Sequence, residues 1–222
     1  ADHAPEVDKN SYSNIEVVKG ADAVKYGSEA LGGIVLMQPS PLPYDVSGLH
    51  GMASALYGTN GRRFGASGYV ESSFKWLGNW AWRLHVNQEN GGDRSTAKYL
   101  LNNTGMREND FSLTLGYSHN AWRFETGYSL FAQKIGVMQS AQMGNEQLLQ
   151  ERIRLGRPVD ITPFSRHIGY PFQEITHHTA FFKAFFNHQA LGNFSFQSTF
   201  QQDNRRENRI RRMNHSNIPT VS

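Results

Sequence analysis

The feature that most constrains this chain is an alternation of apolar and polar side chains with a period of two, which recurs from Gly48 onward. A period of two is typical of β-strands, because successive side chains point to opposite faces. Residues 79–87 show the pattern clearly, with one face that carries Trp80, Trp82, Leu84 and Val86. The other face of this segment carries Arg83, His85 and Asn87. The pattern predicts a mostly β structure whose strands have one apolar and one polar face.

Further segments repeat this alternation. It is clear in 111–118, 122–130, 178–188 and 193–201, and weaker in 48–57 and 63–74. The sequence therefore predicts about seven strands. Strands of about ten residues are long for a soluble sheet and match the length that a tilted strand needs to cross a bilayer. A soluble β-sandwich also alternates, so the choice between the two folds depends on other features.

The expected connections between these strands alternate in length. Turns near 75–79, 119–121 and 189–192 are short, whereas the loops at 90–109 and 133–174 are long. Transmembrane β-barrels combine short turns on one side of the membrane with long loops on the other. This alternation therefore favours an up-and-down transmembrane barrel.

Tryptophan positions favour the same fold. All four tryptophans lie beside two of the short turns, at Trp76, Trp80, Trp82 and Trp122. Tryptophan is enriched at the membrane–water interface, where the ring is partly buried and the indole N–H stays hydrated. We therefore expect one aromatic belt at one end of the strands, and we favour a membrane barrel over a soluble sandwich.

Residues 1–38 follow a different pattern. Two short apolar segments, 15–20 and 34–37, predict strands, and 21–30 between them predicts one or two helical turns. The three prolines of PSPLP, residues 39–43, cannot donate ladder hydrogen bonds, so a sheet cannot continue there. We therefore expect a first unit at 1–38, a proline-rich linker at 39–47 and barrel strands at 48–222.

Residues 15–37 resemble the C-terminal part of the plug domain of TonB-dependent outer-membrane receptors. The matching residues include Ile15, Glu16, Val17, Lys19, Gly20, Tyr26, Gly27, Ser28, Gly32 and Gly33. Ala21 departs from the pattern, since many members have proline after the glycine. The resemblance implies an α+β plug inside a barrel of about 22 strands. The expected fold is therefore the C-terminal part of a plug followed by about seven strands of a partial antiparallel transmembrane β-barrel.

The resemblance also implies a function and a location. A receptor of this family sits in the bacterial cell outer membrane and actively imports a scarce nutrient, such as a metal ion, a metal chelate, a siderophore or heme. Its expected partners are the TonB energy-coupling protein, outer-membrane lipid and lipopolysaccharide, and the small-molecule or metal ligand, but not nucleic acid. We expect the chain to be a piece of a longer receptor, with the coupling segment and the remaining strands outside it.

Asp2 and His3 are the candidate metal ligands. The opening ADHAPEVD resembles a loop in a subset of these receptors associated with uptake of zinc or other metals. Carboxylate and imidazole groups both bind Zn²⁺ well. Further ligands would come from loop residues, among which His167, Glu174, His177 and His178 are available. The alternative is that Asp2 and His3 are ordinary loop residues, and no cofactor is expected other than a transported metal or chelate.

Charged residues of the plug and the last strand offer further contacts. Glu16 and Lys19 are structural plug residues that could pair with lumen-facing Arg83, Arg123 or Glu125, or form a solvated face. The basic run RRENRIRR, 205–212, suggests contact with anionic lipopolysaccharide or an anionic ligand, with a solvated strand end as the alternative.

No enzyme is expected, because the sequence lacks a G-x-S-x-G elbow, a Walker loop and an H-E-x-x-H motif. Two other functions remain open at this point. One is a passive or adhesive outer-membrane β-barrel without gated transport. The other is a soluble β-sandwich that binds anions through 205–212.

Overall fold

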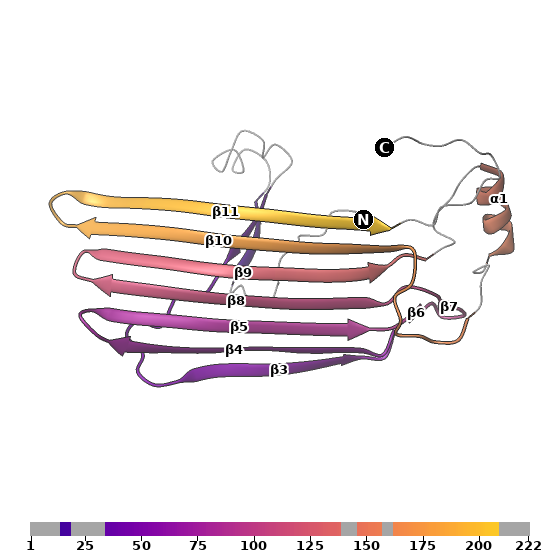
Figure 1. Ribbon diagram of the computed structural model, residues 1–222, viewed down its shortest axis with the longest axis horizontal. Coiled ribbons are helices and arrows are strands. Elements are labelled where there is room, and N and C mark those ends of the chain that lie inside the picture. The colour runs from indigo at the N-terminus through magenta and orange to yellow at the C-terminus, as the bar shows by residue number, and fades with distance from the viewer. Residues whose placement is uncertain (1–13, 19–33, 139–145, 157–161, 209–222) are drawn as a thin grey trace.

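The computed structural model describes residues 14–18, 34–138, 146–156 and 162–208. Within them, seven long strands form one antiparallel sheet in the order β11-β10-β9-β8-β5-β4-β3 (Figure 1). These strands are β3 (His50–Gly58), β4 (Arg63–Lys75), β5 (Asn79–Gly91), β8 (Met106–His119), β9 (Trp122–Gly136), β10 (Phe172–His188) and β11 (Gly192–Asn208). Each long strand pairs with the next long strand along the chain, so the sheet is a meander. The predicted mostly β fold and its antiparallel sheet are confirmed.

Four short strands and one helix lie outside this sheet. β1 (Asn14–Val18) pairs with β2 (Ile34–Gln38) in a separate antiparallel hairpin. β6 (Arg94–Ser95) pairs with β7 (Leu100–Leu101) within the β5–β8 connection, and α1 (Glu146–Leu155) lies within the β9–β10 connection.

A membrane-crossing helix would have to be both long and apolar, and none of the described residues form one.

Burial along the strands follows the predicted alternation. In β5, Ala81, His85 and Asn87 are buried, with 0%, 5% and 2% of their surface exposed, whereas Val86 between them is 48% exposed. Strand register extends this pattern across the sheet, because directly paired residues share a face. His85, for example, pairs with Ser112 of β8, and Val86 pairs with Phe111. The polar and apolar faces of each strand therefore combine into two faces of the whole sheet.

The strands extend further than the alternation predicts. β5 runs to Gly91 and β8 starts at Met106, so both enter the range 90–109 that was expected to be a loop. β9 likewise runs to Gly136 and β10 starts at Phe172, at the edges of the expected 133–174 loop. In these extensions the side chains of both faces are mostly polar. The backbone pairing between strands therefore continues beyond the last residues that alternate between apolar and polar.

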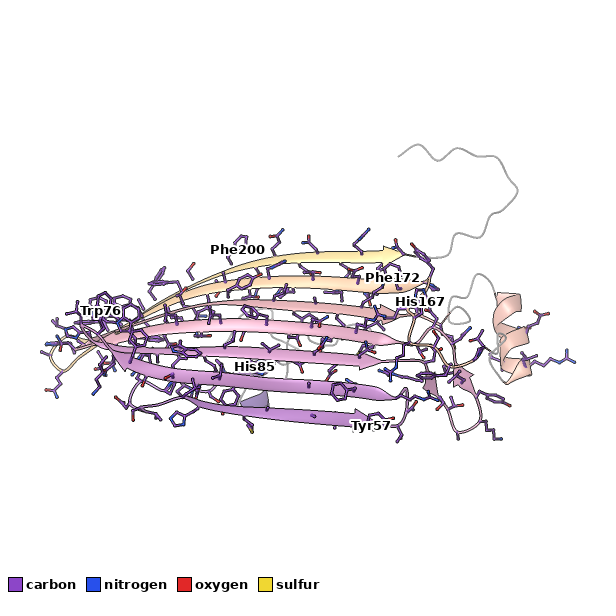
Figure 2. The ribbon with its side chains drawn as sticks, turned by 60° about the horizontal axis from the view of Figure 1, so that its bottom comes forward. Tyr57, Trp76, His85, His167, Phe172 and Phe200 are labelled. Carbon is purple, nitrogen blue, oxygen red and sulfur yellow. The ribbon has the colours of Figure 1, made fainter. Side chains whose placement is uncertain are left out.

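All four tryptophans lie at the same end of the sheet, as predicted. The β4–β5 turn carries Trp76, with Trp80 and Trp82 just after it, and Trp122 opens β9. Antiparallel pairing brings the β4–β5, β8–β9 and β10–β11 turns to this end (Figure 1). Figure 2 shows Trp76 at this turn end and His167 toward the opposite end, where the longer connections lie.

Candidate functional site

Segment 39–47 lies against one face of the sheet, which we call the inner face; the opposite face is the outer face. Leu42 and Tyr44 from this segment form a small buried core with Ala81 of β5. Gly116 of β8, opposite Ala81, leaves room for this contact. A side chain at Gly116 would overlap the phenol of Tyr44 and one methyl group of Leu42.

Arg83 fastens the same segment to the sheet. Its guanidinium donates to the backbone oxygens of Ser40 and Pro41, each at 2.7 Å. The same group is paired with Glu71 of β4, with Nη2 2.6 Å from the carboxylate. Both side chains of this ion pair are mostly buried. Hydrogen bonds from a charged guanidinium are stronger than those between neutral groups, so Arg83 binds the linker tightly to the sheet.

Tyr44 provides a second anchor. Its hydroxyl donates to Glu125 Oε1 of β9 at 2.8 Å, and the Arg123 guanidinium lies 4.5 Å from the centre of the phenol ring. Burial raises the pKa of the Tyr44 phenol above its ordinary value. The hydrogen bond to Glu125 and the negative charge of that residue raise the pKa further, whereas Arg123 lowers it. Tyr44 is therefore held as a neutral hydrogen-bond donor.

A polar cluster occupies the inner face toward the end opposite the tryptophans. The Asn87 amide donates to Asp110 Oδ2 at 2.8 Å and to Glu108 Oε2 at 3.3 Å. Glu89 is 7% exposed and forms an ion pair of 2.5 Å with Arg63. The carboxylates of Glu89, Glu108 and Asp110 lie here together with the cation Arg63. They give this part of the inner face a negative potential. Such a surface can hydrogen-bond a polar ligand or attract a cationic one.

The outer face carries a band of exposed apolar side chains. Examples are Val86, Leu113 and Phe182, which are 48%, 45% and 42% exposed. Across the sheet the band is formed by Trp80, Trp82, Leu84, Val86, Phe111, Leu113, Leu115, Tyr117, Trp122, Phe124, Tyr128, Leu130, Ala180, Phe182, Ala184, Phe186, Phe194, Phe196 and Phe200. Along β5 it runs from Trp80 to Val86, or about 20 Å at about 3.3 Å per residue.

Both borders of the apolar band are distinct. At the turn end, aromatic rings pack together: Trp80 stacks on Phe74 with ring centres 5.9 Å apart, and Trp122 lies tilted against Phe186 with ring centres 4.7 Å apart. At the opposite end, the outward positions become polar or charged, as in Gln88, Asn90, Asn109, Arg107, Lys134, Gln202, Asn204 and Arg206. An open groove of about 290 Å³ lies within the band, beside Trp80, Leu115, Phe124 and Phe182.

The connections at the far end form one ordered assembly. Asp93, which is buried, accepts hydrogen bonds from the backbone N–H groups of Thr104 and Ser165. Asn103 donates to the backbone oxygens of Val137 and Pro171, each at 2.8 Å. These two side chains therefore join the β5–β8 connection to the β9–β10 connection. Sequence reasoning missed both, although Asp and Asn in a polar loop are the residues that bond to neighbouring backbone groups.

The predicted site residues fall mostly outside the described part of the chain. Asp2 and His3 lie there, as do Lys19, Gly20, Tyr26, Gly27, Ser28, Gly32 and Gly33. Glu16 lies in β1, where only the backbone is described. The suggested partners of the plug charges are described: Arg83 contacts Glu71 and the linker, and Arg123 and Glu125 contact Tyr44.

The four candidate loop ligands do not converge. His177 and His178 are neighbours in β10 and point to opposite faces. His178 is hydrogen-bonded to the Tyr128 hydroxyl at 2.6 Å on the outer face, whereas Glu174 pairs in register with Lys134. His167 lies in the β9–β10 connection. Among the described residues, no three metal-ligating side chains are grouped in a way that could hold an ion.

The basic run also divides between the two faces. β11 continues to Asn208, so Arg205 and Arg206 are strand residues rather than loop residues. Arg205 pairs with Ile175 on the inner face, and Arg206 pairs with Glu174 on the outer face. Residues 209–212 of the run lie outside the described residues.

Comparison with known proteins gives no match: no protein-family model, no curated protein and no solved structure resembles the chain closely enough to count as one. Function is therefore inferred from the faces of the sheet and from the residues that line them.

Proposed function

We propose that the seven-stranded sheet is part of the wall of a TonB-dependent receptor, which actively imports a scarce nutrient across the bacterial outer membrane. The apolar band of the outer face is the observation that carries this proposal. Its length of about 20 Å along β5 corresponds to about 14 Å along the membrane normal for a strand tilt of about 45°, which is more than half of the apolar band of about 25 Å found on transmembrane barrels. Its aromatic border and its polar border correspond to the two interfaces of a bilayer.

Exposure of the band supports a lipid environment over water. Phe194, Phe196 and Phe200 of β11 are 62%, 59% and 66% exposed. A contiguous apolar surface of this kind on a soluble protein attracts partners or causes aggregation. Lipid tails are as apolar as these side chains, so the same surface is stable in a bilayer. Backbone groups inside the sheet are already paired, which a bilayer requires of any segment that crosses it.

The inner face supports a plugged lumen. Its exposed and buried side chains are largely polar, which is typical of the interior of a transmembrane barrel. The linker at 39–47 is bound to this face through Arg83 and Tyr44, directly after the segment that resembles a plug. In this proposal, residues 1–38 belong to a plug that the linker ties to the barrel wall, and the TonB protein transmits energy to that plug.

The decisive experiment is uptake by the complete receptor in its host. We expect the protein in the outer-membrane fraction, and we expect loss of uptake of one metal, chelate, siderophore or heme when either the receptor gene or the energy-coupling protein is deleted. Uptake that continues without the coupling protein would favour the second candidate, a passive barrel. Recovery of the protein in the soluble fraction would instead favour the anion-binding sandwich and overturn the proposal.

Zinc is the most specific proposal for the cargo. It rests on Asp2 and His3, whose carboxylate and imidazole suit Zn²⁺. Calorimetry on the complete receptor and on the variant D2A/H3A should show weaker zinc binding in the variant, with unchanged barrel assembly. Zinc binding should also weaken below about pH 6.5, because a protonated imidazole cannot bind the metal. Equal zinc affinity in both proteins would remove these two residues from the cargo site.

A further inference from the structure

The β3–β4 turn carries one of the two Asn-Gly pairs of the sequence, which are Asn60–Gly61 and Asn90–Gly91. The turn requires glycine at position 61, because its φ is +79° and a Cβ there would lie 3.0 Å from the backbone oxygen of Gly92. Asn60 is exposed. Glycine after asparagine also creates a reactive pair, because glycine has no side chain to keep its backbone nitrogen away from the asparagine amide carbon.

The Asn60 side chain is held by one residue of the β5–β8 connection. Asn60 Oδ1 accepts a hydrogen bond of 2.8 Å from the backbone N–H of Ser95, and Asn60 Nδ2 donates to the backbone oxygen of Ser95 at 3.1 Å. Ser95 lies in β6, opposite Leu100 of β7. Both backbone hydrogen-bonding groups of Ser95 therefore point to Asn60, and these two hydrogen bonds join the β6–β7 hairpin to the β3–β4 turn.

The characteristic reaction of an Asn-Gly pair is deamidation. The deprotonated backbone nitrogen of Gly61 would attack Asn60 Cγ, and the bond from Cγ to the side-chain nitrogen would break, so that this nitrogen leaves as ammonia with a proton from water. Water then adds to one carbonyl carbon of the cyclic imide and breaks its bond to nitrogen, which leaves aspartate or isoaspartate. The attack requires the Asn60 amide carbon to turn toward the Gly61 nitrogen, and the two hydrogen bonds to Ser95 oppose this rotation.

Two arginines lie next to the reacting atoms. Arg94 Cγ is 3.6 Å from the position that a Cβ would take at Gly61, so this side chain lies against the glycine. Arg62 follows Gly61 in the chain, and both arginines are exposed. A nearby positive charge stabilises the anionic backbone nitrogen and the oxyanion that develops on the Asn60 amide. The arginines therefore accelerate the attack, whereas the hydrogen bonds to Ser95 slow it.

The second Asn-Gly pair has a different environment. Asn90 lies within β5 and pairs with Phe64 of β4 and Arg107 of β8. Pairing on both sides fixes the extended backbone of this segment, so the nitrogen of Gly91 cannot turn toward the Asn90 side chain. Asn90–Gly91 is therefore an internal comparison, with the same two residue types in a backbone that prevents the reaction.

We propose that Asn60 is a site of spontaneous deamidation, and that its conversion loosens the β6–β7 hairpin from the β3–β4 turn. The product lacks the N–H donor to the backbone oxygen of Ser95 and places a carboxylate oxygen beside it. Two acceptors then face each other without a proton between them, which destabilises the contact. The inference depends on this pair and its neighbours alone, so it holds whether or not the proposed function of the sheet is correct.

Peptide mass spectrometry of the full-length protein during incubation at neutral and alkaline pH measures the reaction at both pairs. In the folded protein, Asn60 should be converted at about one tenth of its rate in the denatured protein, because the two hydrogen bonds to Ser95 together contribute about 1.4 kcal/mol. Asn90 should stay intact until the protein is denatured. The rate at Asn60 should rise with pH, because the deprotonated nitrogen is the nucleophile. Conversion of Asn60 no faster than that of Asn90 in the folded protein would overturn the inference.

Two variants test the control by Ser95. S95P removes the N–H donor, at a loss of about 1 kcal/mol, and should raise the rate at Asn60 about fivefold. S95A keeps both backbone groups and removes only the hydroxyl, which lies 3.5 Å from Asn60 Oδ1, so it should react as the wild type does. An intact Asn90 in each variant shows that the sheet is folded. Equal rates at Asn60 in S95P and the wild type would refute the protective role of Ser95.

The variant N60D tests the structural consequence. Lys98 lies in the β6–β7 hairpin, and trypsin should cleave after it about fivefold faster in N60D, because one hydrogen bond of about 1 kcal/mol is lost. N120D is the matched control, because Asn120 is an exposed asparagine in the β8–β9 turn at the opposite end of the sheet. It should be cleaved at the rate of the wild type. Equal cleavage of N60D and the wild type would show that Asn60 does not hold the hairpin.

Discussion

Tyr44 is the side chain that joins the linker to both charged residues of β9 on the inner face. Its hydroxyl bonds to Glu125, and its ring lies under Arg123 and beside Ala81. Tyr44→Phe keeps the ring and removes the hydrogen bond to a carboxylate, which should cost about 1–2 kcal/mol. We expect faster protease cleavage within 39–47 in the folded receptor. Tyr57→Phe is the control, because Tyr57 is an exposed tyrosine at the far end of the sheet, and equal cleavage of both variants would contradict this role of Tyr44.

The raised pKa of Tyr44 also predicts a pH dependence. Because the folded state holds the neutral phenol, stability from this residue is fully present below the ordinary tyrosine pKa of about 10 and is lost as the pH rises above it. The wild type should therefore lose its stability advantage over Tyr44→Phe above about pH 10. Thermal unfolding of both proteins at pH 8 and pH 11 measures this difference, and a constant difference would show that the phenol does not titrate with release of the linker.

Adjacent residues on opposite faces offer a direct test of environment. Leu113 points to the outer face and Ser112 to the inner face, where it pairs with His85 and Ser129. Leu113→Arg should impair assembly in the outer membrane, because arginine near the bilayer midplane costs about 2–4 kcal/mol. Ser112→Arg adds the same side chain to a polar surface and should assemble with a higher yield. Heat-modifiable mobility of the two variants on gels gives the yields, and equal values would show that the outer face does not meet lipid.

At the scale of the elements, Asp93 joins two connections that are far apart in the sequence. Its carboxylate accepts from the backbone N–H groups of Thr104 and Ser165. Asp93→Ala leaves both donors without this partner, at a cost of about 1–3 kcal/mol. Hydrogen exchange at Thr104 and Ser165 should therefore become at least about fivefold faster, whereas the amides of central β8 should keep their protection. Asp45→Ala removes an exposed carboxylate and is the control; unchanged exchange in Asp93→Ala would refute the link.

The elements also show which parts of the fold could be predicted. Alternation placed Trp80, Leu84 and Val86 on one face and Arg83 and His85 on the other, because the two faces of the sheet differ in polarity and this difference recurs every second residue in the sequence. It did not predict the ends of β5 or β10. Both faces are polar there, so backbone pairing between strands produces no alternation in the sequence. The docking of Leu42 and Tyr44 on Ala81 was also not predicted, because a linker contact between distant segments has no local period.

At the scale of the molecule, the seven-stranded sheet has two edges, β3 and β11, that pair with no further strand among the described residues. Unpaired backbone groups cost several kcal/mol each in hydrocarbon, so a sheet with open edges is not a stable transmembrane structure. In the proposed receptor these edges pair with other strands and close a barrel. A closed barrel would place β11 within its wall rather than at an edge. The outer face of β11 would then also meet lipid, which is consistent with the apolar side chains of Phe194, Phe196 and Phe200 on that strand.

The two ends of the sheet should face opposite sides of the outer membrane. Lys75 lies at the short-turn end, and Lys98 lies in the β5–β8 connection at the other end. The sequence has no cysteine, so Lys75→Cys and Lys98→Cys each introduce a single thiol that can be labelled selectively. In intact cells, a membrane-impermeant maleimide should label Lys98→Cys in the complete receptor. Lys75→Cys should be labelled only after the outer membrane has been permeabilised, because short turns of such barrels face the periplasm. Labelling of both thiols in intact cells, or the reverse order, would contradict the proposed orientation, and labelling of the denatured protein controls for thiol reactivity.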